Sequence, residues 1–432
     1  MASRLMTPRR MAWVALLVLA AALATTVIVT TPWHPLPGAG SLHGDAARDF
    51  TPEEIERAKR FHNHIRWPFG AGLLLGLVVV GLMGLTGGGA ALIRWSGGLL
   101  SWWWLKVLVG VALISLVLLV VALPFNVWSE TILRRYGLST QSWASWTSDV
   151  VKSYAVAVVI TSIGLILLIG MARRFDDWWF VPGGLAAFLL VLLASFAYPV
   201  VVEPLFNQFT PMQDGPLRTS LLTLAAEDGV HVNEVLVADA SRRTTALNAY
   251  VSGFGSTRRI VVYDTLLDSS SPEEVQLVVA HELGHAKNND VLHGTLIAAL
   301  GAAAGVAVLA LLLGWPALLQ RSGAGGAGDP AVVALLVTLT SYGAFLVMPV
   351  ENLVSRHIEA RADVHSLDLT HDPAGVVDLG RRLAITNLSQ LQPNRWLYAW
   401  FGSHPTTVDR IEGAREWARL NGMEAPPPSV SP

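Results

Sequence analysis

The chain has 432 residues, of which 52% are hydrophobic and only 14% are charged, and its formal net charge is −2. Soluble proteins carry about 25% charged residues, so this composition is typical of a membrane protein in contact with a lipid bilayer. The small net charge and the lack of a recognition motif argue against a nucleic-acid partner. Because the chain contains no cysteine, disulfides and thiolate metal sites are excluded.

Seven apolar segments are each long enough to cross a bilayer, which takes about 20 residues in a helix. Five fall within residues 1–201, and two form a hairpin over residues 291–350. We expect these spans near residues 11–31, 69–93, 104–124, 153–171, 181–201, 292–315 and 332–350. The sequence therefore predicts a mainly α-helical, polytopic membrane protein.

The first span has an alternative interpretation, and two polar stretches between the spans carry predictions of their own. The first segment contains LAAALATT, whose small residues also suit a cleaved signal peptide, but its length favours a retained helix. The polar stretch 45–67 contains a short amphipathic helix at 51–66, with a capping box formed by Thr51 and Glu54. Residues 126–151 are expected to be a polar loop.

Residues 202–290 have the composition of a soluble module. We expect a helix over 221–229 that Gly229 closes, and a strand over 232–241. A β-hairpin is expected over 247–267, with its turn at Gly253 and Gly255.

The segment SPEEVQLVVAHELGHAKNND (271–290) begins like a helix, because Ser271 and Glu274 make a second capping box. On that helix His281 and His285 lie one turn apart on one face, where two imidazoles can share one zinc ion. Glu282 lies beside them, placed to take a proton from a water that zinc activates. The alternative is an ordinary helix with surface histidines, but the flanking valines predict that this turn is buried, where unpartnered polar groups are unfavourable.

A catalytic zinc site takes a third protein ligand, and Glu359 is the strongest candidate. The seventh span continues into a helix over 351–370, on which Glu359 and Asp363 share a face. Asp363 can then accept an N–H from a ligating imidazole. The alternative is a charged surface helix. Two spans separate His285 from Glu359, so both helices emerge on the same side of the membrane. We expect one Zn²⁺ per chain, close to the membrane surface.

Other residues are assigned more weakly by the sequence. His293 is expected to be an interfacial polar residue rather than a group that supports the metal site. The segment 351–425 reads as the ligand helix followed by a polar helical region, and the tail 426–432 is expected to be disordered.

The motifs HELGH (281–285) and NLVSRHIEARAD (352–363) together resemble the type 1 CAAX prenyl endopeptidases, which are seven-span zinc metalloproteases with a membrane-enclosed chamber. The stretches PLFNQFTPM (204–212), LNAYVSGFGSTRRIVVYDTLL (247–267) and SHPTTVDRI (403–411) agree with this resemblance. It extends over nearly the whole chain.

The resemblance implies roles for individual residues. His281, His285 and Glu359 match the zinc ligands, Glu282 the catalytic base and Asp363 the acidic residue behind a ligand. Asn248 and Ala249 match an edge strand that pairs with the substrate backbone, and we expect Tyr250 to bind substrate as well. His404 matches a histidine that stabilises the oxyanion, a role in which Tyr250 is a further candidate. Arg356 and Asn352 lie in the ligand-helix motif, where Arg356 is expected to hold Glu359 or Asp363 in place. The pair Ala246–Leu247 departs from the family's usual His–Ser.

These observations predict an integral-membrane zinc metalloendopeptidase that acts on a peptide or protein substrate. The substrate is either a lipid-modified protein or, for a bacterial housekeeping protease, a membrane-embedded one. The remote alternative is a non-enzymatic seven-span transporter or receptor, which would leave the paired motifs unexplained. We expect a monomer. Arginine-rich composition with abundant Ala and Gly favours a bacterial cell membrane.

The membrane orientation is not decided by charge. Arg4, Arg9 and Arg10 favour an N-terminus inside the cell, which would place the protease module outside. The family resemblance implies a cytosolic catalytic face, and Arg134 and Arg135 support that opposite orientation.

Overall fold

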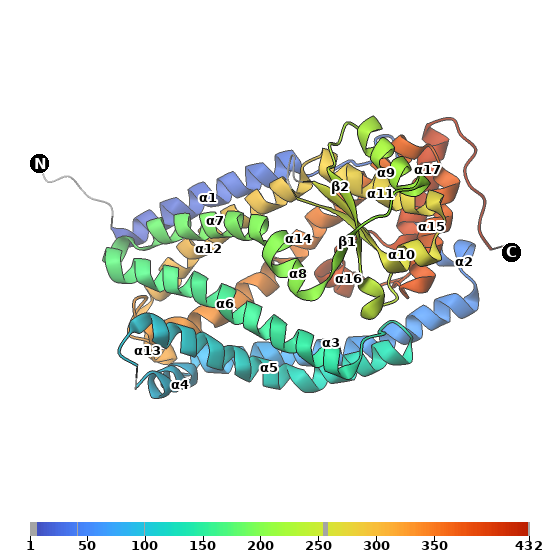
Figure 1. The fold of residues 1–432 in the computed structure, drawn as a ribbon. Coiled ribbons are helices and arrows are strands. Elements are labelled where there is room, and N and C mark those ends of the chain that lie inside the picture. Colours follow the sequence, from blue (N-terminus) through green and yellow to red (C-terminus); the bar gives the residue numbers. More distant parts are fainter. Residues whose placement is uncertain (1–6, 41, 99, 254–257, 431–432) are drawn as a thin grey trace, which may run out of the picture.

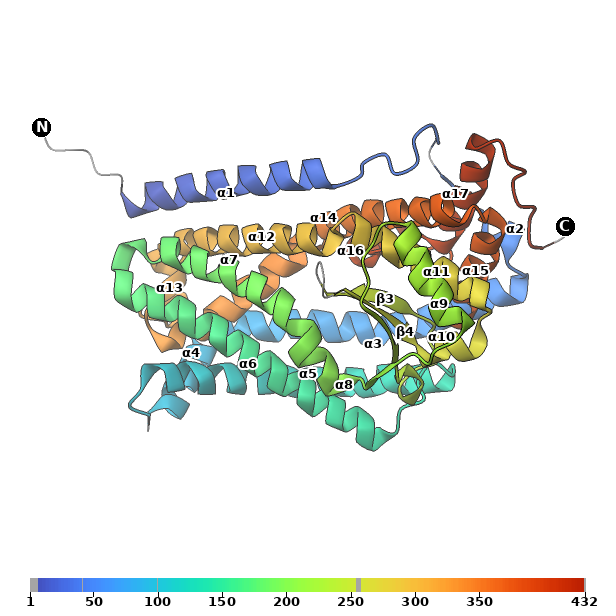
Figure 2. The same ribbon diagram turned by 45° about the horizontal axis from the view of Figure 1, so that its top comes forward.

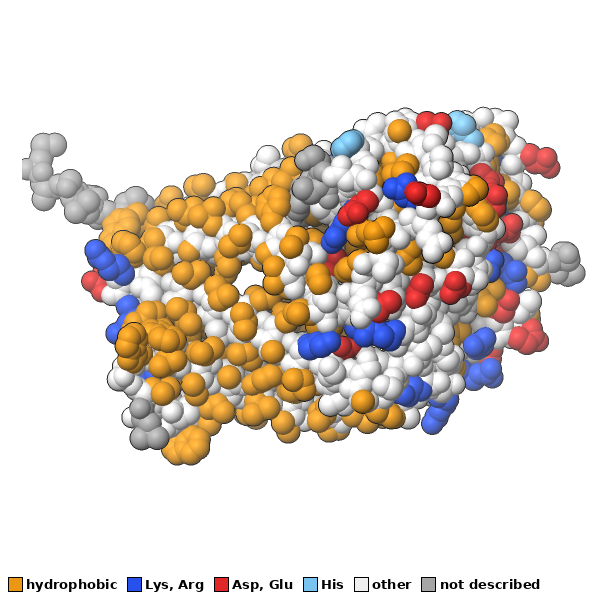
Figure 3. All heavy atoms as spheres, in the orientation of Figure 1, with side chains coloured by type: hydrophobic (Ala, Val, Ile, Leu, Met, Phe, Trp, Pro, Cys, Tyr) orange, Lys and Arg blue, Asp and Glu red, His pale blue; other side chains and the backbone are white. Residues whose placement is uncertain are grey.

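Seven helices within the described part of the chain are long and apolar enough to cross a membrane. The computed structural model describes residues 7–40, 42–98, 100–253 and 258–430. The spanning helices are α1 (Pro8–Thr30), α3 (Pro52–Leu85), α5 (Trp103–Arg135), α6 (Trp143–Phe175), α7 (Phe180–Ala197), α12 (Asp290–Leu313) and α14 (Val333–Thr370). They run side by side, and the soluble module lies at one end of the bundle (Figures 1 and 2). On the face drawn in Figure 3, hydrophobic side chains cover the length of the bundle, and charged ones lie on the module and at the opposite end of the bundle.

The second and third spans have other ends than predicted: α3 begins earlier and ends earlier, and α5 ends later. Helix α3 combines the amphipathic stretch and the second span without a break, and the expected capping box of Thr51 and Glu54 is present. It ends at Leu85 rather than near residue 93, because Gly87 turns the chain with a φ of 77°. Residues Gly88–Gly97 form a separate helix, α4.

The polar loop expected over 126–151 is also largely helical. Helix α5 continues to Arg135, where Arg134 pairs with Glu130 at 2.8 Å, one turn away on the same helix. Helix α6 begins at Trp143, after Ser142 caps it. Helices therefore continue past the membrane into the polar region, and polar composition alone does not mark their ends.

The remaining connections are short helical elements. These are α2 (Ala46–Asp49), η1 (Asp176–Trp178), the π-helix η2 (Tyr198–Val202), α8 (Glu203–Phe206), η3 (Ala240–Arg242), α13 (Pro316–Ser322) and η5 (Pro330–Val332). The π-helix and α8 continue α7 toward the sheet.

A four-stranded sheet forms the centre of the module. Its strands are β1 (Phe209–Pro211), β2 (Glu234–Ala238), β3 (Ala249–Ser252) and β4 (Arg259–Tyr263), in the order β1-β2-β4-β3. The predicted hairpin is confirmed: β3 pairs antiparallel with β4, with Tyr250 opposite Val261. Gly253 has a φ of 90° at the start of its turn, whereas Gly255 lies outside the described residues. Strand β1 was not expected, and β2 pairs with β4 in parallel.

Helix α11 (Pro272–Lys287) packs on one face of this sheet. Val279 and Leu283 of the helix share a buried core with Val235, Ile260 and Val262 of the strands. The same core contains residues of α9 (Pro216–Glu227), which is followed by Gly229 at a φ of 73°, and of α10 (Asp264–Ser269). Burial on this face fixes the orientation of α11, and so decides which way its histidines point.

The C-terminal helices are α15 (Pro373–Thr386), α16 (Arg395–Phe401) and α17 (Thr407–Leu420). The expectation of a disordered tail is wrong for residues 426–430. The buried Arg415 donates to the carbonyl oxygen of Pro426 at 3.0 Å and to Asp49 Oδ2 at 2.9 Å. The Val430 N–H donates to the Arg48 carbonyl oxygen at 3.1 Å. These bonds join the tail to α2 and α17.

Candidate metal centre

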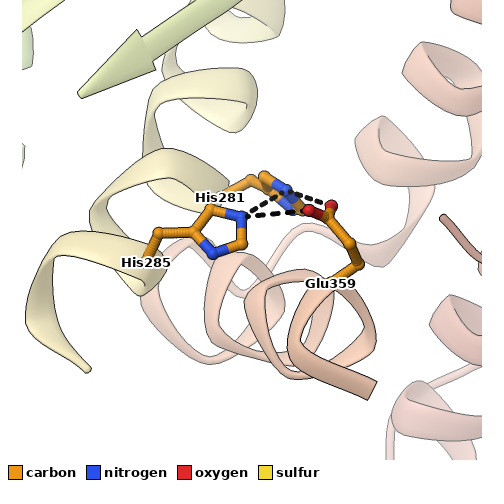
Figure 4. A group of neighbouring side chains, drawn as sticks. All are labelled: His281, His285 and Glu359. Atoms are coloured by element: carbon orange, nitrogen blue, oxygen red, sulfur yellow. Dashed lines mark hydrogen bonds and ion pairs between the residues drawn. The ribbon is translucent and has the colours of Figure 1, made fainter. Parts of the chain in front are cut away.

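Two histidines of α11 and one glutamate of α14 meet where these helices cross. The side chains of His281, His285 and Glu359 point toward one another (Figure 4). His281 Nε2 lies 3.3 Å from His285 Nε2 and 3.4 Å from Glu359 Oε2. His285 Nε2 lies 3.7 Å from Glu359 Oε1. The sequence-predicted ligand set is thus brought together from two helices that are far apart in the chain.

The other nitrogen of each imidazole faces a carboxylate. His281 Nδ1 lies 3.0 Å from Asp363 Oδ1, and His285 Nδ1 lies 2.9 Å from Asp290 Oδ2. A proton on each Nδ1 directs the Nε2 lone pair into the cluster, which is the usual arrangement behind metal-ligating histidines. The role expected for Asp363 agrees with this geometry, whereas Asp290 was missed.

Two arginines in turn hold these carboxylates. Arg410 binds Asp363 in a bidentate manner, with its Nε 2.9 Å from Oδ2 and its Nη2 2.5 Å from Oδ1. Arg361 donates to Asp290. Sequence reasoning missed both arginines, although Arg410 lies in the SHPTTVDRI stretch that carries the family resemblance.

The donor atoms fit a single zinc ion. Two nitrogens bound to one tetrahedral zinc at about 2.0–2.1 Å lie about 3.3–3.4 Å apart, and the observed separation of the two Nε2 atoms is 3.3 Å. Two facing lone pairs at this distance repel each other unless a proton or a cation lies between them. Two imidazoles and one carboxylate are also a ligand set of catalytic zinc sites.

Protonation of the ligands competes with the metal. Burial by itself lowers the pKa of His281, but hydrogen bonds to Asp363 and Glu359 outweigh it and raise that pKa to about 10. In the absence of metal the ring is therefore a cation near neutral pH. Metal binding must displace this proton, so metal affinity rises with pH.

Glu282 lines the same cavity as the ligands without belonging to the cluster. Burial raises its pKa above the ordinary value of 4.5, although the nearby histidines act in the opposite direction. A carboxylate with a raised pKa is a better proton acceptor, as a general base near neutral pH requires.

His404 approaches the cluster from a different element. Its Nε2 lies 3.4 Å from Glu359 Oε2, and its Nδ1 lies 2.9 Å from the hydroxyl of Ser403. The side chain is 58% exposed. Burial of part of the ring lowers the pKa of His404, which favours a neutral imidazole that donates a hydrogen bond.

Arg356 and Asn352 support His404 rather than the metal ligands. Arg356 Nη1 donates to the Gly402 carbonyl oxygen at 2.5 Å, and its guanidinium lies over the Tyr398 ring. Asn352 Nδ2 donates to the Trp400 carbonyl oxygen at 2.5 Å. The expectation that Arg356 holds Glu359 or Asp363 is wrong, because its guanidinium is directed at the segment before His404.

The cluster opens into a cavity of about 890 Å³ that the edge of the sheet also borders. Asn248 and Ala249 lie along this edge, and no described strand pairs with the outer side of β3. Tyr250 lines the cavity too, but its side chain packs with Leu236 and Val261 on the sheet face opposite α11. Its hydroxyl donates to Glu203 at 3.4 Å. Tyr250 is therefore wrongly placed to stabilise an oxyanion, although its backbone borders the cavity.

The structure also places Leu247 and His293, which the sequence singled out. Leu247, which stands where the family often has serine, is buried, and its N–H donates to Asn387 at 3.2 Å. His293 lies outside the metal cluster, and its buried Nδ1 has no hydrogen-bond partner among the described residues.

Seven apolar helices, and a buried His–His–Glu cluster beside a glutamate with a raised pKa, define an integral-membrane metallopeptidase. Comparison with known proteins agrees. Residues 211–418 match the model of Peptidase family M48, and residues 47–208 match that of the CAAX prenyl protease N-terminal region, five membrane helices. The chain belongs to peptidase family M48.

Individual relatives show how far the likeness extends. The chain is 30% identical to the uncharacterized metalloprotease YhfN of Bacillus subtilis, over 86% of this chain and 88% of the relative. It is 28% identical to CAAX prenyl protease 1 of Saccharomyces cerevisiae, over 69% of this chain and 70% of that protein. The crystal structure of S. mikatae Ste24p shares the fold, with a TM-score of 0.76 over 93% of this chain and 98% of that one, at 21% identity.

Proposed function

We propose that this membrane metalloendopeptidase uses one zinc ion, held by His281, His285 and Glu359, to hydrolyse peptides bound along the edge of β3. The observation that carries the proposal is the convergence of three ligand atoms from α11 and α14, with a carboxylate behind each imidazole. Zinc, when bound, acts as a Lewis acid and lowers the pKa of water from about 15.7 to about 7. The chain's own residues supply the rest of the chemistry.

Glu282 is the proposed general base. Its carboxylate takes a proton from the attacking water and later delivers it to the leaving amine. The buried position of Glu282 favours this return of the proton, because burial raises its pKa.

His404 is the proposed donor to the oxyanion. It lines the same cavity as the cluster, and its Nε2 is 3.4 Å from Glu359 Oε2. A preorganised donor stabilises the charge that develops on the carbonyl oxygen, and such donors contribute about 10²–10³ to kcat.

The outer edge of β3 is the proposed binding site for the substrate backbone. Asn248, Ala249 and Tyr250 border the cavity, and an extended peptide can add as a further strand to those backbone groups of β3 that face away from β4. Such pairing holds the scissile bond in an extended conformation beside the metal ligands.

The substrate class is a separate proposal. Some relatives carry the name CAAX prenyl protease, which makes prenylated proteins one candidate. The other candidate substrate is an unmodified segment of a membrane protein. It is supported by the bacterial relative, which is named only as a metalloprotease, and by the arginine-rich composition, which favours a bacterial cell membrane. Rates for a farnesylated and an unmodified peptide of the same sequence separate them. All proposed ligands come from one chain, so we propose an active monomer.

A Glu282→Gln variant tests the proposal. The purified full-length variant should hold about one zinc per chain, as the wild type should, because Glu282 is not a ligand. Hydrolysis of peptides should be lost. Substantial remaining hydrolysis would refute the assigned base, and a wild-type protein without zinc would refute the metal site.

A further inference from the structure

A second cavity, of about 640 Å³, lies where the end of β3 meets the membrane helices α7 and α12. The surface of its wall is mainly apolar, although two glycines, two tyrosines, three hydroxyl side chains and Glu203 line it beside the aliphatic residues. The lining includes Val191, Ala194, Pro199, Val291, Gly294 and Ala298. Helices α7 and α12 are joined here by a hydrogen bond of 2.7 Å between the hydroxyl groups of Ser195 and Thr295.

This cavity adjoins the one that contains the metal ligands. Tyr250, Val251 and Val291 line both. The free edge of β3 therefore runs from the metal cavity into the second one. Val251 and Ser252 of β3 line the second cavity and lie two and three residues beyond Ala249, so a peptide paired with Ala249 reaches this cavity about two or three residues further along.

The wall of the second cavity offers no unpaired charge to a ligand. Glu203, its one ionisable carboxylate among the described lining residues, lies 3.6 Å from Arg259 Nη2 and accepts from the Tyr250 hydroxyl. Ser252 accepts from Arg259 Nε at 3.1 Å. A charged group placed here would lose its hydration without gaining a partner, whereas an apolar group gains from leaving water.

We infer that the second cavity is a specificity subsite that receives a large apolar side chain of the substrate, two or three residues from the scissile bond. The inference rests on the proposed binding of substrate along β3, and adds which residues of the substrate are selected. Helices α7 and α12 then select the substrate at the membrane side of the sheet, while α11 and α14 carry out the chemistry.

Gly294 provides the sharpest test. Gly294 lines the cavity and a Cβ at this position meets no atom within 4 Å, so Gly294→Leu adds apolar volume at this wall. Gly305→Leu is the matched control, because Gly305 lies on the same helix with equally open space and does not line either cavity. The full-length, zinc-loaded proteins are assayed with a series of peptides. In each peptide a single position is varied, and it carries Leu, Ala, Asp or Lys.

The series should reveal one position at which the wild type cleaves the Leu peptide with a kcat/KM at least about tenfold higher than the Asp or Lys peptide. Gly294→Leu should reduce the Leu-to-Ala ratio at that position by about tenfold, and Gly305→Leu should leave the ratio at the wild-type value. Should Gly294→Leu fail to retain zinc, Ala298→Leu, whose side chain faces the same cavity, replaces it.

Two results would overturn the inference: no position with a preference for apolar side chains, or equal ratios in Gly294→Leu and Gly305→Leu. Both leave hydrolysis itself intact. If the zinc-loaded wild type cleaves no peptide of the series or of an unbiased peptide library, the proposed function fails, and the subsite fails with it.

Discussion

Removal of Asp290 should weaken metal binding although Asp290 is not a proposed ligand. Asp290 Oδ2 lies 2.9 Å from His285 Nδ1, and its side chain is only 10% exposed. In Asp290→Ala the imidazole loses the carboxylate that fixes its tautomer, and Arg361 loses its partner. Loss of such a carboxylate typically lowers metal affinity by about 10–100-fold, or about 1.4–2.7 kcal/mol.

The measurement is a zinc titration of the purified protein in competition with a chelator of known affinity. Asp214→Ala is the control, because Asp214 is 95% exposed and its ion-pair partner among the described residues is Arg218. Asp290→Asn should fall between the two, since its amide oxygen can still accept from Nδ1–H without the negative charge. Equal zinc affinities in Asp290→Ala and Asp214→Ala, with both proteins folded, would refute the tautomer argument.

Three further outcomes are expected. His404→Ala should lower kcat by about 10²–10³ while zinc content stays at the wild-type level, and a kcat unchanged in steady-state assays would remove His404 from the reaction. Arg410→Ala leaves the carboxylate of Asp363 without its bidentate partner. The variant should therefore lose about 1.5–3 kcal/mol of unfolding free energy, measured by unfolding in SDS, and an unaltered midpoint would contradict a stabilising ion pair. Glu282 must be unprotonated to act as a base, and burial raises its pKa. As the pH is lowered, kcat/KM should therefore fall at a pH above 4.5, and a fall that begins only at or below 4.5 would argue against Glu282.

The placement of the three proposed metal ligands was predictable because local rules determine it. Ser271 and Glu274 mark the start of α11, and a spacing of four residues puts His281 and His285 on one face. Glu359 was chosen from its motif beside Asp363, and topology allowed the choice, since two spans between the motifs return the chain to the same side. The structure brings these three side chains together as the sequence indicated.

The residues behind the ligands could not be predicted from spacing. Asp290 lies after a break in the helix, where Asn289 takes the left-handed conformation with a φ of 54°, so helical periodicity does not relate it to His285. Arg356 lies three residues before Glu359, yet its long side chain turns toward Gly402. Arg410, from a helix far along the chain, takes the place that proximity in sequence suggested for Arg356.

The ends of the membrane helices were missed for a related reason. Hydropathy reports where a helix leaves the bilayer, whereas backbone hydrogen bonding decides where it stops. Helix α5 continues past Val127 to Arg135 because nothing in that stretch interrupts its hydrogen bonds, and α3 stops only where Gly87 adopts a positive φ. Strand β1 was too short, at three residues, to leave an alternating pattern.

The central claim is that α11 and α14 jointly hold one metal ion. X-ray diffraction from crystals of the zinc-loaded, full-length protein, recorded on both sides of the zinc absorption edge, tests it most directly. The account predicts one anomalous peak per chain, about 2.0–2.2 Å from Nε2 of His281, Nε2 of His285 and a carboxylate oxygen of Glu359. A peak elsewhere, or one bound by the histidines with Glu359 directed away, would contradict it.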